Sequence, residues 1–161
     1  FYRDNRITPI YEGTNSVQAA DLVFRKLINR NGDVIDKYIN LVREEINIKD
    51  ERAQPFVKQL HYHLGILSKF TDWIKEKIKN SPEDASGACN DYLKVLGLVA
   101  TGHAWLKVLE VSFNEYDSNK DFYEDKIQTA NFFYNRILPR IDSNYITATT
   151  GSNYIMNYKF N

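Results

Sequence analysis

A carboxylate followed by small and hydroxyl-bearing residues lies near the start of the chain, where Glu12 precedes Gly13 and Thr14. A free glutamate has a pKa near ~4.3 and is a weak base, but burial beside apolar groups raises that pKa towards the range useful for proton abstraction. Glycine lets the backbone pass close to a ligand, and the N–H groups at a helix start bind phosphates or polar cofactor edges. The same residues also have a structural interpretation, with Glu12 as a first-turn acid near the helix dipole and Thr14 as a cap. Taken without its neighbours, the short pattern favours this structural interpretation.

The neighbours of Glu12 extend the pattern over residues 2–18, which read YRDNRITPIYEGTNSVQ. This string resembles the acyl-CoA dehydrogenase segment that reads approximately Y-R-D-x-R-I-x-x-I-Y-E-G-T-x-x-I-Q, and nearly every fixed position matches. The resemblance implies that Glu12 is the catalytic base, removing the proton alpha to the thioester while a hydride leaves the beta carbon for N5 of FAD. It also implies that Gly13 contacts the substrate. The residues that it places near the flavin are Thr14, Asn15 and Ser16.

The chain lacks most of what that chemistry requires. In acyl-CoA dehydrogenases, most flavin and substrate contacts come from sequence before this motif, including a strand-rich middle domain. An arginine that some relatives carry twelve residues after the glutamate falls on Phe24, with Arg25 one step away, so this role is not transferred. The chain also opens with Phe1 rather than methionine. We therefore expect a carboxy-terminal fragment that does not bind FAD and is inactive by itself.

The remaining sequence resembles the helical domain that long acyl-CoA dehydrogenases append to their core. The resemblance rests on residues 132–140, which read FFYNRILPR, and on Gly151 followed by residues 154–156, which read YIM. It divides the chain into the end of the catalytic core, residues 1–32, and an appended helical bundle, residues 33–161. Long enzymes of this kind act on methylthio-alkanoyl-CoA or fatty acyl-CoA. The family also implies an acyl-CoA substrate, an electron-transfer acceptor and a homo-oligomer, either a dimer or a tetramer.

An alternative interpretation is a non-catalytic helical interaction or oligomerisation module. Such a bundle would dock on the core of the longer protein or between its subunits. The two interpretations are compatible if most of the chain is the appended domain. Mixing the purified chain with FAD and an acyl-CoA tests these interpretations, and we expect neither bound flavin nor flavin bleaching.

Helical periodicity dominates the chain and predicts an all-α fold, an antiparallel bundle of about five long helices. The start signals lie near Thr14, Asp33, Asp50, Ser81 and residue 120. The apolar stripe predicted for the first helix comprises Val17, Ala20, Val23, Leu27 and Ile28. Three glycines in the fourth helix are expected to allow close helix approach: Gly87, Gly97 and Gly102. Proline lacks the donor that a helix needs, so Pro139 is expected to kink the fifth helix.

Composition excludes several classes of function. Lys plus Arg and Asp plus Glu both number 21, which argues against a nucleic-acid or polybasic membrane-surface partner. No apolar run approaches the ~20 residues that span a bilayer. The single cysteine, Cys89, excludes an internal disulfide and suits a reducing compartment, so we expect a cytoplasmic protein. His61 and His63 point to different sides of a helix and His103 is isolated, so no metal site is predicted.

Overall fold

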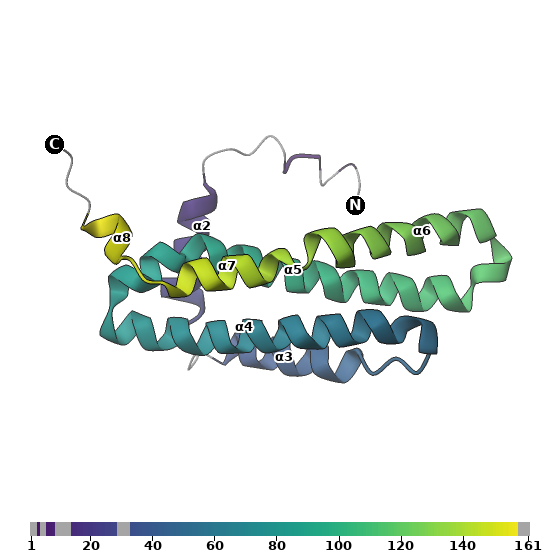
Figure 1. Cartoon of the computed structure of the whole chain (residues 1–161), viewed down its shortest axis with the longest axis horizontal. Coiled ribbons are helices and arrows are strands. Elements are labelled where there is room, and N and C mark those ends of the chain that lie inside the picture. Colours follow the sequence, from purple (N-terminus) through teal and green to yellow (C-terminus); the bar gives the residue numbers. More distant parts are fainter. Residues whose placement is uncertain (1–2, 4–5, 9–13, 29–32, 158–161) are drawn as a thin grey trace.

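The computed structural model describes residues 3, 6–8, 14–28 and 33–157. All regular structure in this part of the chain is helical, which confirms the predicted all-α fold. Figure 1 shows two long helices, α4 and α5, lying side by side, with α3 along α4 and the α6–α7 run returning along α5. The chain reverses between successive long helices, as the predicted antiparallel bundle requires.

The first described helix, α2, spans Asn15–Asp21 and continues as a π-helical turn, η1, over Leu22–Lys26. The buried residues of this helical segment are Ala19, Val23 and Leu27, which are spaced four residues apart. The predicted stripe is therefore partly wrong: Val17 and Ile28 are 66% and 47% exposed. The π turn widens the helix, because the Leu27 N–H bonds to Leu22 O five residues back, and this changes which residues face the bundle.

Two helices with clear apolar stripes follow. Helix α3 spans Val34–Glu45, and its buried residues are Ile35, Ile39 and Val42. A 3-10 turn, η3, spans Glu51–Ala53 and leads directly into α4, which spans Gln54–Asn80. Asp50 caps η3 by accepting a hydrogen bond from the Arg52 N–H at 2.8 Å. The apolar residues of α4 are buried from Phe56 to Ile74, because they recur every three or four positions and so share one face of the helix.

Helix α5 spans Pro82–Asn114 and is the central element of the fold. The helix starts at the signal predicted near Ser81. Pro82 occupies its first turn, and Ser81 is at the N-cap without a side-chain capping bond. The helix contacts α2, α4, α6 and α7, so it buries several faces. Cys89 is buried, and burial raises the pKa of its thiol, as expected for an inert structural cysteine. By length and composition alone α5 could also cross a membrane, a test that the core helix of a soluble bundle passes too.

The last part of the chain returns along α5. A short 3-10 turn, η4, spans Tyr116–Ser118, and α6 spans Lys120–Phe132. A second π turn, η5, spans Phe133–Ile137, and α7 begins anew over Arg140–Thr149 with Pro139 at its N-cap. The expected interruption at Pro139 therefore takes the form of a π turn and a fresh helix start. Helix α8 spans Asn153–Met156 after Gly151, which has a φ of 83°.

The glycines of α5 differ in what surrounds them. A Cβ at Gly102 would lie 3.1 Å from Leu60 Cδ1 and 3.4 Å from Leu138 Cδ1, so close approach is confirmed there. At Gly97 no described atom lies within 4 Å of that position, so the same prediction is wrong for Gly97. The helix surface at Gly97 is open to solvent instead.

Candidate functional site

The predicted catalytic and substrate-binding residues, Glu12 and Gly13, lie outside the described residues. The structure does describe the three residues predicted to lie near a flavin, and all three are exposed: Thr14, Asn15 and Ser16. Thr14 is the N-cap of α2, and its side chain makes no capping hydrogen bond. Its carbonyl oxygen accepts the Gln18 N–H at 2.9 Å, which is the first bond of the helix.

Helix α2 is attached to α5 by one polar contact and an apolar face. The Asn90 amide donates to Ser16 Oγ at 3.2 Å. Ala19 and Val23 are fully buried, and Leu27 is 1% exposed. The described end of the motif, from Thr14 onwards, is therefore held against the long central helix.

The described residues at the start of α2 could contact only the edge of a bound cofactor. Thr14, Asn15 and Ser16 offer exposed hydroxyl, amide and N–H groups at the start of a helix, which can bond a polar ligand edge. A flavin site also needs apolar walls that exclude water, and the exposed side chains here do not supply them. Arg25, one step from the position of the arginine in some relatives, pairs instead with Asp21, with 2.5 Å between Nε and Oδ1.

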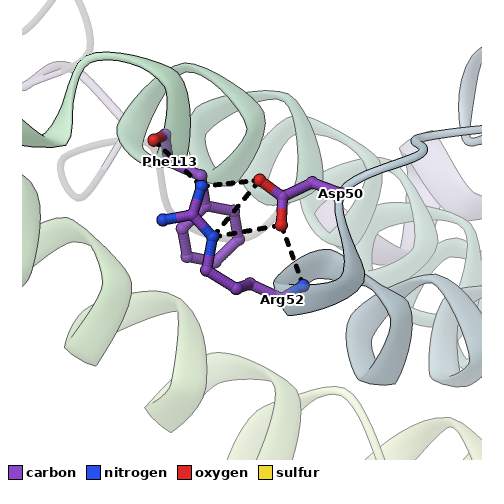
Figure 2. Close-up of polar contacts among 3 residues, drawn as sticks. All are labelled: Asp50, Arg52 and Phe113. Carbon is purple, nitrogen blue, oxygen red and sulfur yellow. Dashed lines mark hydrogen bonds and ion pairs between the residues drawn. The ribbon is translucent and has the colours of Figure 1, made fainter.

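A cluster that the sequence did not predict links the α3–α4 connection to the end of α5 (Figure 2). Arg52 Nη2 lies 2.6 Å from Asp50 Oδ2 and donates to the Phe113 carbonyl oxygen at 3.1 Å. The guanidinium also lies over the Phe113 ring, 4.6 Å from its centroid. The hydrogen bond from Arg52 lowers the pKa of Asp50. Every group in this cluster has a partner within it, so we interpret it as a structural clamp.

Two histidine clusters join pairs of helices. His63 Nε2 lies 3.3 Å from Asp142 Oδ2, and Tyr62 donates to the other oxygen of that carboxylate at 2.8 Å, which raises the pKa of Tyr62. These contacts connect α4 to α7. His63 itself is buried between the two helices.

The second histidine cluster connects α5 to α3. Lys107 Nζ lies 2.6 Å from Glu45 Oε2, and the resulting hydrogen bond lowers the pKa of Glu45. His103 Nε2 lies 2.9 Å from the same oxygen but is not aligned for a hydrogen bond. No group of three metal-ligating side chains occurs among the described residues, so neither cluster has the composition of a metal site.

Comparison with known proteins defines the class of protein to which this helical chain belongs. A family described as acetyl-CoA dehydrogenase C-terminal like matches residues 34–159, most of the chain. The chain belongs to this family. The match covers the bundle from α3 onwards and begins after the segment that contains Glu12.

Two relatives are similar over nearly the whole chain. The 3-methylmercaptopropionyl-CoA dehydrogenase of Ruegeria pomeroyi is 29% identical over 145 residues, which cover 86% of this chain and 24% of the relative. The broad-specificity linear acyl-CoA dehydrogenase FadE5 of Mycobacterium tuberculosis is 25% identical over 170 residues, which cover 97% of this chain and 28% of the relative. The chain thus spans about a quarter of the length of these relatives and is consistent with a C-terminal fragment of an acyl-CoA dehydrogenase.

Proposed function

We propose that this chain is the C-terminal part of an FAD-dependent acyl-CoA dehydrogenase that oxidises acyl-CoA to trans-2-enoyl-CoA. The observation that supports this most strongly is the pair of relatives named as acyl-CoA dehydrogenases, one of which matches 97% of the chain. That match leaves only a few residues out, so it extends beyond the bundle to the segment that contains Glu12. The proposed enzyme acts in the cytoplasm as a homo-oligomer and passes electrons to an electron-transfer acceptor.

In the proposed reaction Glu12 takes a proton from the carbon alpha to the thioester carbonyl. Two hydrogens leave the substrate, one as this proton and one as a hydride from the beta carbon, and a double bond forms between the two carbons. FAD supplies the hydride acceptor when it is bound by the longer enzyme. Burial of Glu12 against the acyl chain and the walls of that enzyme would raise its pKa and make it an effective base.

The separate 161-residue chain is proposed to be inactive. Thr14, Asn15 and Ser16 are exposed at the start of α2, which supports the absence of a closed flavin site on this fragment. We expect the purified chain to bind no stoichiometric flavin and to show no flavin bleaching when FAD and an acyl-CoA are added. A yellow complex that is reduced by acyl-CoA would contradict the proposed inactivity.

The base assignment is tested in the longer enzyme that carries this segment. We expect Glu12→Gln to lower turnover by at least about 10²- to 10⁴-fold, the usual contribution of a general base, while FAD stays bound. The matched control is Glu44→Gln, which changes an exposed glutamate on α3 in the same way. Turnover and the flavin absorbance spectrum would be measured for both variants. Near-normal turnover of Glu12→Gln would remove Glu12 from the base role.

A non-catalytic role is the second candidate function. The family match covers residues 34–159, which leaves Glu12 outside it, and this favours a bundle that acts by docking. The bundle would then serve as an interaction or oligomerisation module in the longer enzyme. Deleting residues 34–159 from that enzyme separates the two roles: loss of the oligomer with retained flavin reduction by acyl-CoA supports the docking role.

A further inference from the structure

His63 is a buried histidine between α4 and α7, and the proposed dehydrogenation does not use it. Both of its ring nitrogens face oxygen atoms. Nδ1 lies 2.8 Å from the Gln59 carbonyl oxygen, one turn back on α4, and Nε2 lies 3.3 Å from Asp142 Oδ2 on α7. A carbonyl oxygen and an ionised carboxylate only accept hydrogen bonds. Both contacts are therefore hydrogen bonds only when each ring nitrogen carries a hydrogen, which is the positively charged form of the ring.

The second proton of this contact belongs on the ring and not on the carboxylate. In an unstructured chain, aspartate holds its proton only below about pH 3.9, whereas histidine holds its second proton up to about pH 6.5. The Asp142 side chain is 37% exposed, so water as well as protein solvates its charge. Its other oxygen accepts a hydrogen bond from the Tyr62 hydroxyl at 2.8 Å. Burial disfavours a charge on the His63 ring, but the two oxygen acceptors replace the water that the ring loses.

Asp142 is the charged group that faces the His63 ring. On α4 itself, the neighbouring Tyr62 ring lies edge-on to the imidazole, with 5.0 Å between the ring centroids. Helices α3 and α5 and the η3 turn also pack against α4. Among the described residues of these three elements, no side chain forms a hydrogen bond or an ion pair with His63. The proton on the ring is therefore stabilised mainly by Asp142.

Helix α7 depends on the same carboxylate for its polar attachment. Within the described part of the chain, Asp142 is the one α7 residue whose side chain hydrogen-bonds to another helix, and both of its partners are on α4. Pro139, which lacks an N–H, precedes the helix, and Gly151, with a φ of 83°, follows it. The rest of the attachment is apolar and includes the buried Ile141 and Ala148. Because apolar side chains do not titrate, the contacts of Asp142 are the part of this attachment that responds to pH.

We propose that His63 and Asp142 form a protonation-dependent clasp between α4 and α7. With its second proton, the ring donates to Asp142 and holds α7 against α4. Without it, one ring nitrogen presents a lone pair to an oxygen atom, and α7 loosens. The proton has a carboxylate partner in the folded chain and none in the unfolded chain. Its stabilising contribution is therefore fully present below about pH 6.5 and is lost as the pH rises.

Nitrogen-15 NMR of the histidine rings tests the charge directly. The purified chain is titrated through the histidine range, from about pH 5.5 to about pH 8.5. The signals are assigned with His61→Gln and His63→Gln, and His61 is the internal control because it is exposed on the same helix. We expect both nitrogens of His63 to keep their hydrogens to a higher pH than those of His61. A His63 ring that loses its second proton at the same pH as His61, or at a lower one, would overturn the inference.

Hydrogen exchange of the α7 amides tests whether this proton holds the helix. Protection is compared between about pH 6 and about pH 8.5, after correction for the intrinsic effect of pH on exchange. We expect α7 protection to fall about tenfold in the unchanged chain and in the control His61→Gln, the effect of one pH unit of differential proton binding. It should stay level in His63→Gln, which lacks the titrating ring, and in Asp142→Asn, which keeps the shape of the side chain without its charge.

Circular dichroism would check that each variant keeps its helical content. Protection of α7 that does not change with pH in the unchanged chain would contradict the clasp. A fall of the same size in His63→Gln and Asp142→Asn would also contradict it, because another group would then be responsible. The clasp is independent of the proposed dehydrogenation, and neither measurement requires FAD or an acyl-CoA.

Discussion

Gly102 shows how a single residue sets the distance between helices. A Cβ added there would lie 3.1 Å from Leu60 Cδ1 of α4 and 3.4 Å from Leu138 Cδ1. Both leucines are fully buried, so neither can move aside into solvent. The Tyr134 hydroxyl also donates to the Gly102 carbonyl oxygen at 2.8 Å. Tyr134 itself is fully buried, and this burial raises the pKa of its phenol.

We expect Gly102→Ala to destabilise the fold although alanine is the better helix former. The gain in helix propensity is about 1 kcal/mol, whereas overpacking a buried contact costs about 1–3 kcal/mol. Gly65→Ala on α4 is the matched control, since no described atom lies within 4 Å of a Cβ there and the propensity gain should remain. Urea unfolding would compare the two variants, and Gly102→Ala should be less stable than Gly65→Ala by about 1–3 kcal/mol. If the two variants were equally stable, Leu60 and Leu138 would have to make room for the added methyl group without strain, which would contradict this prediction.

At the scale of elements, one carboxylate holds the short helix α8 and the preceding turn against the bundle. Asp84 Oδ1, in the first turn of α5, accepts hydrogen bonds from the Ser152 N–H and hydroxyl, both at 2.8 Å. Lys77 of α4 lies 3.1 Å from its other oxygen. These donors, first of all the Ser152 N–H, hold the pKa of Asp84 well below its usual range. Gly151 permits the turn that brings Ser152 there, because its φ of 83° disfavours other residues.

The depressed pKa of Asp84 makes the docking of α8 dependent on pH. A carboxylate whose pKa is lower in the folded than in the unfolded chain contributes stability above the unfolded pKa of about 3.9, and that contribution is lost as the pH falls towards the folded pKa. We therefore expect Asp84→Asn to lower the melting temperature at pH 7 and this deficit to shrink below about pH 4. Melting temperatures of both proteins between pH 7 and pH 3 provide the measurement.

The control for this pH series is Glu83→Gln, a change at the exposed neighbouring position. It removes a nearby acid without touching the bonds to Ser152, so its effect on the melting temperature should be small. A deficit of Asp84→Asn that stayed the same from pH 7 to pH 3 would contradict the proposed role of the charge.

At the scale of the whole molecule, α2 belongs to the same apolar core as the bundle behind it. Ala19, Val23 and Leu27 form a continuous cluster with the buried residues of α3, α4, α5 and α7. The predicted division of the chain at residues 32 and 33 remains a prediction. In the folded chain the two predicted parts share a core, so residues 14–28 contribute to the stability of the bundle.

Leu27→Ala tests whether α2 contributes to this core. Leu27 is 1% exposed, and truncating a buried leucine costs about 2–5 kcal/mol. Ile28→Ala is the matched control, because Ile28 is 47% exposed and its truncation should change the free energy of unfolding by no more than about 0.5 kcal/mol. Both are measured by urea unfolding of the purified chain. A Leu27→Ala cost as small as that of Ile28→Ala would show that α2 is not packed in solution.

The sequence by itself determined the helical elements and the family. Apolar residues at spacings of three and four predicted α3, α4 and α5, and the Ser81–Pro82 signal placed the start of α5, because these signals act within one or two turns. The family followed from the string around Glu12 and from the segment that ends at Arg140, and the match over residues 34–159 confirmed it.

Only the tertiary structure decided what depends on residues far apart in the chain. It showed that Arg52 clamps Phe113, that Asp84 holds Ser152, and that His63 meets Asp142. It also distinguished Gly102, which is enclosed by two leucines, from Gly97, which faces open space. Periodicity tells which residues share a face of one helix, but the neighbours of that face are set by how the helices pack, and no local pattern contains that information.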